Sequence, residues 1–180
     1  MVYKFRVILD TEEDIFRDIA ILSTDTLEDL HNALVNAFDF DGQEMASFYT
    51  CDEQWNQEDE IALFDTGDTP GEQQIMSDYV LEDLLDKENT KIIYVYDFLN
   101  MWTFLIELAA IEEVTAGETY PTTLFSHGFM PAEAGDNNFE ADLHDDIYGE
   151  FEDDLDEDDL DLFDENEGGY EDHGYDDSWN

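Results

Sequence analysis

Residues 91–114 read KIIYVYDFLNMWTFLIELAAIEEV, and this stretch decides the fold. Its first part, Lys91 to Phe98, is rich in β-branched and aromatic residues, which is typical of a β-strand. A tight turn at Leu99-Asn100 separates it from a second such run, Met101 to Val114. The stretch therefore predicts a β-hairpin whose aromatic side chains pair across its two strands.

The N-terminal residues predict a second hairpin followed by a helix. Apolar residues alternate with others in residues 2–9 and again in 16–21, and the connection between them, 11–14, is short and polar. Residues 26–38 begin with capping residues and carry leucines at helical spacing. We expect this helix to lay one apolar stripe on the sheet.

The middle of the chain adds weaker elements. Strands are expected at 45–51 and 61–64, an exposed loop at 66–74 and a short helix at 77–85. Residues 115–128 hold turn formers and hydroxyl groups, and no strand is expected there. The order predicts an α+β fold, a largely antiparallel sheet with two helices packed on it.

Charge divides the chain into a domain and a tail. The chain has 51 Asp and Glu against five Lys and Arg, a net charge of −46, and every basic residue lies within the first 91 positions. From residue 141 onward, 19 of 40 residues are acidic. We expect a folded domain at 1–135 and a disordered acidic tail at 136–180, because such a tail has too little apolar surface to offset its ordering entropy.

The same composition excludes several kinds of partner. Phosphate binding draws on Lys and Arg, so direct binding to nucleic acid or to an anionic membrane is not expected. Residues 101–111 are too short to span a bilayer and contain Glu107. A single cysteine, Cys51, rules out an internal disulfide and fits a reducing cytoplasm.

Two segments resemble a known family. Thr26-Leu27, Asp29-Leu30-His31 and Ala37-Phe38 match its Thr-Leu, Asp-Leu-His and Ala-Phe signature, and the hairpin matches its Tyr-x-Tyr-Asp-Phe segment at 94–98. Over residues 2–135 the chain resembles the plasmid Ri open-reading-frame-three-like family, also known as the passenger TnpR family of insertion elements. The resemblance implies a compact α+β domain carried by mobile elements, with no established activity.

The chain also departs from the family pattern. The residues that differ are Leu99-Asn100, Phe104, Asp39-Phe40 and Ala134, and several of them put apolar or neutral groups where the family pattern has polar ones. We therefore do not expect pocket chemistry of relatives to be retained.

Three residues are candidates for catalysis. His31 on the first helix, Asp97 before the hairpin turn and His127 in a Ser-His-Gly segment are the residue types of a hydrolase. Two of them also have a structural interpretation: a helix-edge imidazole bonded to the sheet or to a neighbouring carboxylate for His31, and a turn-fixing carboxylate for Asp97. The signal at His127 is weak, because no Gly-x-Ser-x-Gly motif accompanies it. We favour the structural interpretation and assign no catalytic residue, with a hydrolase kept as the alternative.

No cofactor or metal site is expected. The segment Asp164 to Gly169 begins like a calcium-binding loop but lacks its closing glutamate, and His144 and His173 are isolated. The tail carboxylates are expected to collect divalent cations only weakly and diffusely.

The favoured function is non-enzymatic binding of a basic protein through the tail. Carboxylates there would speed encounter and apolar side chains would anchor it. A nucleic-acid-binding protein is the partner class we expect first; a purely solubilising tail with no partner is the other alternative. The partner-binding residues are Phe151, Asp153, Asp154, Leu155, Asp158, Asp159, Leu162 and Phe163.

Overall fold

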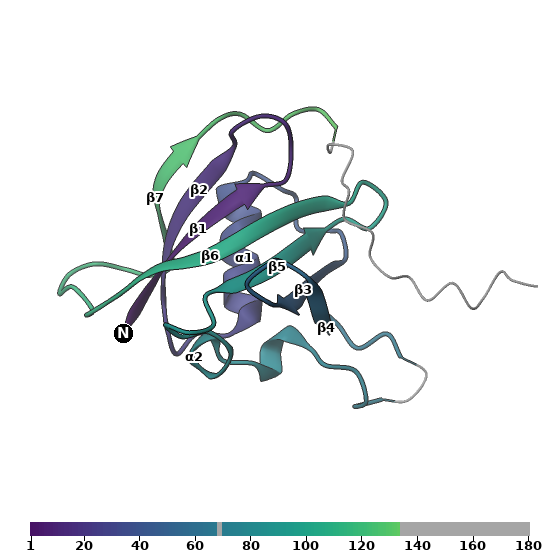
Figure 1. The fold of residues 1–180 in the computed structure, drawn as a ribbon, viewed down its shortest axis with the longest axis horizontal. Helices are drawn as coiled ribbons and strands as arrows, with labels where there is room; N and C mark the ends of the chain where they lie inside the picture. The colour runs from purple at the N-terminus through teal and green to yellow at the C-terminus, as the bar shows by residue number, and fades with distance from the viewer. Residues whose placement is uncertain (68–69, 134–180) are drawn as a thin grey trace, which may run out of the picture. The chain divides into compact units, whose positions relative to one another are not determined.

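A computed structural model of the chain describes residues 1–67 and 70–133, and the expected tail at 136–180 lies outside them. The described part is one seven-stranded sheet in the order β4-β3-β5-β6-β1-β2-β7, with every neighbouring pair of strands antiparallel (Figure 1). The α+β expectation is confirmed. The strands are β1 (Val2–Leu9), β2 (Phe16–Leu22), β3 (Ala46–Cys51), β4 (Gln57–Ala62), β5 (Lys91–Tyr96), β6 (Trp102–Glu112) and β7 (Thr122–His127).

Strand β1 lies inside the sheet, between β6 and β2. It pairs with β2, as the predicted N-terminal hairpin requires, and on its other side with β6. Its alternating pattern places Phe5 and Val7 in the main core, with exposed fractions of 1% and 0%. Arg6, between them, belongs to the opposite face.

Helix α1 (Leu27–Ala37) covers one face of the sheet (Figure 1). Thr26 caps it with a capping box, in which the Thr26 hydroxyl accepts from the Asp29 amide and the Asp29 carboxylate accepts from the Thr26 amide. Leu27, Leu30 and Leu34 are completely buried in the core shared with the sheet. The predicted apolar stripe is confirmed.

The β5–β6 hairpin is present, but its turn is longer than the predicted Leu99-Asn100 pair. It runs from Asp97 to Met101, and both of these residues have positive φ angles, of 60° and 55°. The Asp97 carboxylate accepts hydrogen bonds from the Leu99 amide at 3.1 Å and the Asn100 amide at 3.4 Å. An Asx-type turn with left-handed residues at both ends explains the wider loop.

Two predicted elements are wrong in detail. The helix expected at 77–85 is a 3₁₀ turn, η1 (Met76–Asp78), followed by the four-residue α2 (Leu81–Leu84). Val80 forms a β-bridge with Thr26, and this pairing holds Tyr79 and Val80 in extended conformations that interrupt the helix. Strand β4 lies at Gln57–Ala62, earlier than the expected 61–64, because it pairs with β3.

Strand β7 was not expected at all. It pairs antiparallel with β2 over residues 16–20 and forms one end of the sheet, while β4 forms the other. A β-bulge between Asp18 and Ile19 adds Leu124 to the β7 side of this pairing.

Arg17 of β2 joins three elements around one buried guanidinium group. Its Nε donates to the Ala37 carbonyl at 3.1 Å, at the end of α1, and its Nη1 donates to the His127 carbonyl at 2.7 Å, at the end of β7. Further bonds reach the carbonyls of Phe16 and Gly128. The guanidinium also lies 4.9 Å from the ring centre of Phe38. We call these contacts the Arg17 clamp.

The clamp solves a local problem of helix α1. No basic residue lies in the last turn of this helix, so its terminal carbonyls lack a cationic partner from the helix itself. Arg17 supplies one from the neighbouring strand, although its residue is only 7% exposed. Burial lowers the pKa of Arg17 from its usual value, while the nearby Asp39 raises it.

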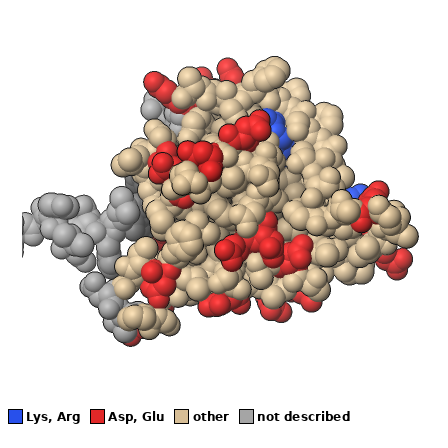
Figure 2. Space-filling view, turned by 180° about the vertical axis from the view of Figure 1, so that it is seen from behind, with Lys and Arg blue, Asp and Glu red and all other residues tan. Residues whose placement is uncertain are grey.

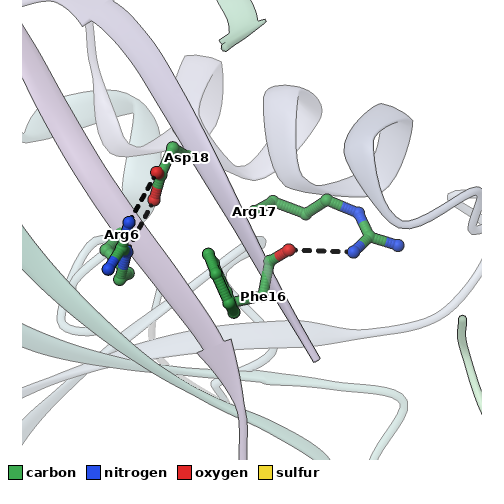
Figure 3. Close-up of polar contacts among 4 residues, drawn as sticks. All are labelled: Arg6, Phe16, Arg17 and Asp18. Atoms are coloured by element: carbon green, nitrogen blue, oxygen red, sulfur yellow. Dashed lines mark hydrogen bonds and ion pairs between the residues drawn. The ribbon is translucent and has the colours of Figure 1, made fainter. Parts of the chain in front are cut away.

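Arg6 provides the contrast on the opposite side of β2. Its guanidinium makes two hydrogen bonds to the Asp18 carboxylate, at 2.9 and 2.8 Å, in an exposed pair. Figure 3 shows this pair on one side of the β2 ribbon and Arg17 extending from the other. Exposed ion pairs of this kind contribute roughly 0.2–1 kcal/mol.

We expect Arg17→Ala to destabilise the domain far more than Arg6→Ala. Removing Arg17 leaves carbonyls of β2, α1 and β7 without their charged donor, at a cost on the order of 3 kcal/mol. Removing Arg6 should cost about 0.5 kcal/mol. Urea unfolding of the two variants measures both; equal losses would contradict the clamp.

Candidate protein interface at the β7 edge

The β7 edge is an uncharged surface in a strongly acidic chain. Residues 119–132 read TYPTTLFSHGFMPA and contain no Asp, Glu, Lys or Arg. The opposite edge strand, β4, exposes Glu58, Asp59 and Glu60 in succession. The two edges of one sheet therefore differ completely in charge.

Apolar side chains are exposed along this edge. The exposed fractions are 50% for Leu124, 52% for Phe125 and 93% for Phe129. Exposed apolar side chains that form a continuous patch commonly mark an interaction site.

The edge is held in a defined conformation from both faces. On the face away from α1, the ring of Phe16 stacks on His127 with centroids 5.2 Å apart and lies 5.8 Å from Phe125. The Arg6 guanidinium lies 4.6 Å from the centre of the Phe16 ring. On the other face the Arg17 clamp holds the backbone. We call Phe16, Leu124, Phe125, His127 and Phe129 the β7 edge surface.

Gly128 allows β7 to approach the β1–β2 turn closely. Its φ angle is 76°, and an added Cβ would lie 2.8 Å from the Asp14 carbonyl oxygen and 2.8 Å from Ile15 Cγ1. Both facts require glycine at this position. The end of β7 is thus packed against the start of β2.

His31, the first catalytic candidate, lies in the core with an exposed fraction of 4%. Its Nδ1 is 2.7 Å from the hydroxyl of Tyr94, a completely buried residue of β5. Burial lowers the pKa of His31 to about 4 and raises that of Tyr94 well above its usual value. The pair is neutral at pH 7 and joins the helix to the sheet by an uncharged hydrogen bond.

Asp97, the second candidate, fixes the hairpin turn. Besides the two backbone amides, its carboxylate accepts from the side-chain amide of Asn100 at 2.5 Å. Its own amide donates to the Met45 carbonyl, which ties the turn to the start of β3. These contacts match the turn-fixing interpretation.

His127, the third candidate, belongs to the β7 edge surface. Its ring stacks on Phe16 and its side chain is exposed. Among the hydrogen bonds of residues 1–67 and 70–133, none joins any two of His31, Asp97 and His127. The structure gives the three candidates separate partners in separate parts of the fold.

A polar cleft of about 600 Å³ lies beside Cys51. Burial, with Asp52 and Glu58 adding to it, raises the pKa of the Cys51 thiol to about 11, so the thiol is protonated at pH 7. Across the described residues, no group of three or more His, Cys, Asp or Glu could hold a metal ion. The cleft is lined by Cys51, Asp52, Glu53, Gln54, Glu58, Lys87, Glu88, Asn89, Thr90, Lys91 and Glu107.

The remaining predicted site residues lie outside the described part of the chain. These are Phe151, Asp153, Asp154, Leu155, Asp158, Asp159, Leu162 and Phe163. In the ranges that the structure does describe, no helix is long and apolar enough to cross a membrane.

Sequence reasoning missed the β7 edge surface, although two signals for it are present. One is the 14-residue interruption of the acidic pattern at 119–132. The other is Arg17, a charged residue within the predicted strand 16–21, for which the sequence predicts a neighbouring strand on one side only.

The His31–Tyr94 pair should make stability depend on pH. Because the pKa of His31 is about 4 when folded and near 6.5 when unfolded, the unfolded chain takes up the proton first as pH falls from 6.5 to 4. Stability is lost across that window, by on the order of 2–3 kcal/mol. The control is His31→Asn, which lacks the imidazole but retains every carboxylate. Titration of the carboxylates therefore affects both chains, and the difference between them reports on His31.

Urea unfolding of both chains between pH 7 and pH 4.5 isolates the effect. We expect the native chain to be the more stable at pH 7 and its advantage to shrink as pH falls. A constant difference across that range would contradict the buried neutral state of His31.

Comparison with solved structures supports the fold. The crystal structure of a protein of unknown function, MM3350 from Methanosarcina mazei Go1, matches with a TM-score of 0.59 and 23% identity, covering 69% of this chain and 68% of that one. At this identity the likeness shows the fold alone. A search of curated proteins gave no match.

Comparison with protein families gives a match over most of the chain. The model of the family described as plasmid pRiA4b ORF-3-like protein matches residues 1–167, which extends past the residues 2–135 that carry the resemblance in sequence. The chain belongs to the plasmid pRiA4b ORF-3-like family.

Proposed function

We propose that this chain is a non-enzymatic binding protein that engages a basic partner protein. The observation that carries the proposal is the use of its basic residues. Four of the five Lys and Arg are bonded within the described domain, so few cationic groups are left to pair with phosphates, and the five positive charges offset only a small part of the 51 negative ones.

These internal bonds are specific and short. The Lys4 ammonium lies 2.6 Å from the Glu112 carboxylate. The Lys91 ammonium donates to the Glu53 carbonyl at 2.6 Å and lies 5.0 Å from the ring centre of Trp55. Together with the Arg6–Asp18 pair and the Arg17 clamp, they leave Lys87 as the one basic residue with no such bond to the described residues.

Acidic side chains therefore dominate the charged part of the surface. In the view from behind that of Figure 1, carboxylates form several groups on the surface and basic atoms are few (Figure 2). Such a field attracts cationic partners over roughly 8 Å at physiological salt and repels nucleic acid and anionic lipid.

We assign the capture of the partner to the tail. Its carboxylates would accelerate encounter, and Phe151, Leu155, Leu162 and Phe163 would anchor the partner. We place this binding in the cytoplasm, with a nucleic-acid-binding protein as the first partner class. The bonding of His31 and Asp97 to neighbouring groups of the fold favours binding over hydrolysis.

Affinity capture with the full chain and two variants tests the proposal. One variant changes the tail carboxylates Asp153, Asp154, Asp158 and Asp159 to Asn, and the other changes the four apolar anchors to Ser. We expect a basic protein to be captured at low salt, released as salt rises, and captured several-fold less by each variant.

The two variants separate charge from apolar contact. Failure to capture any basic protein would contradict the proposed function. Capture that neither variant changes would remove the tail from it, and a loss only in the Asn variant would reduce the tail to an electrostatic attractant.

A further inference from the structure

We propose that the β7 edge accepts an extended segment of the basic partner as an added strand, one in which basic and apolar side chains alternate. This inference deepens the proposed function and rests on it. It identifies the surface of the folded domain that the partner contacts and the conformation in which the partner binds.

The first step is the geometry of the edge. Among the described residues, β7 pairs with β2 on one side, and no strand lies on its other side. Residues Phe125–His127 keep regular register with Asp18, Arg17 and Phe16. A six-residue strand offers roughly 20 Å of backbone, enough for a short peptide to pair by main-chain hydrogen bonds.

The second step is the absence of two usual guards of an edge strand, charged side chains and proline. Natural edges are commonly protected by charged side chains or by proline within the strand. Strand β7 has neither, because the nearest prolines, Pro121 and Pro131, lie outside it. Edge β4, in contrast, carries three acidic residues, and Ala62 at its end already pairs with Gln74 and Ile75.

The third step is the presence of apolar anchors. Leu124 and Phe125 are half exposed on the strand, and Phe129 is almost fully exposed just beyond it. Aromatic side chains of this kind supply much of the energy of protein interfaces. The stack on Phe16 and the Arg17 clamp fix this edge before a partner arrives, which lowers the entropy lost on binding.

The fourth step is charge, which selects the occupant. Exposed Glu12, Glu13 and Asp14 lie in the β1–β2 turn, whose Asp14 backbone and Ile15 pack against Gly128 at one end of the edge. Glu118 lies in the loop before β7. An apolar centre with acidic ends matches a segment of alternating apolar and basic residues. A second copy of this chain, of charge −46, or its own C-terminal segment, which has no basic residue, would be repelled.

Two synthetic peptides of equal charge test the inference on the full chain. One alternates lysine with valine over nine residues, and the other has proline in place of each valine. Proline lacks the amide donor and cannot join a β-ladder. We expect the valine peptide to bind at least tenfold more tightly and to slow hydrogen exchange of amides in Thr122–His127, with no such change in β4.

A pair of variants isolates the apolar contact. Phe125→Asp adds negative charge, which would strengthen a purely electrostatic association, yet we expect it to weaken binding of the valine peptide at least tenfold. Phe64→Asp is the matched control, because Phe64 is 57% exposed and lies beyond β4. It should change binding by less than twofold. If Phe125→Asp fails to fold, the exchange measurement on the native chain decides.

The outcomes separate this inference from the proposed function. Equal binding of both peptides, or protection in β4 instead of β7, would overturn the added strand and leave the basic partner in place. Binding of neither peptide would contradict both.

Discussion

The buried guanidinium of Arg17 is the interaction on which the arrangement of this domain depends. One cationic group donates to carbonyls at the end of helix α1, within strand β2 and at the end of strand β7. These carbonyls belong to different elements, and the described fold offers Arg17 no carboxylate bond in exchange. A buried arginine that serves backbone groups alone is tolerated because each of its bonds is charge-assisted and the ring of Phe38 lies beside it.

The small number of basic residues also links the structure to the proposed function. In a chain with five basic residues and 51 acidic ones, each cation bonded within the fold is one fewer that is free to contact a partner. Arg17 and Arg6 act on opposite faces of the same strand, and both support β7, one through its backbone and one through the Phe16 ring that stacks on it. The result is an ordered, uncharged edge on an acidic domain. The acidic domain attracts a basic partner, and the uncharged edge provides the place where that partner binds.

Much of the fold follows from the sequence. The β5–β6 hairpin, the β1–β2 hairpin and the capped helix α1 were predicted because each depends on local periodicity, capping or turn chemistry. The helix expected at 77–85 and the absence of a strand at 115–128 were wrong for a common reason: Val80 and β7 take their conformations from pairing with distant segments, Thr26 and β2. The candidate site shows the same division. The structural interpretations of His31 and Asp97 agree with their observed bonds, whereas the β7 edge surface could not be predicted without the partner strand that orders it.

Native-state hydrogen exchange of the Arg17→Met variant tests the central claim most directly. If the Arg17 clamp joins these elements, the free energies of opening for amides in β7 and in the last turn of α1 should fall together, while those of the β5–β6 hairpin change little. Unchanged protection in β7, or a fall in one of the two elements without the other, would contradict the account.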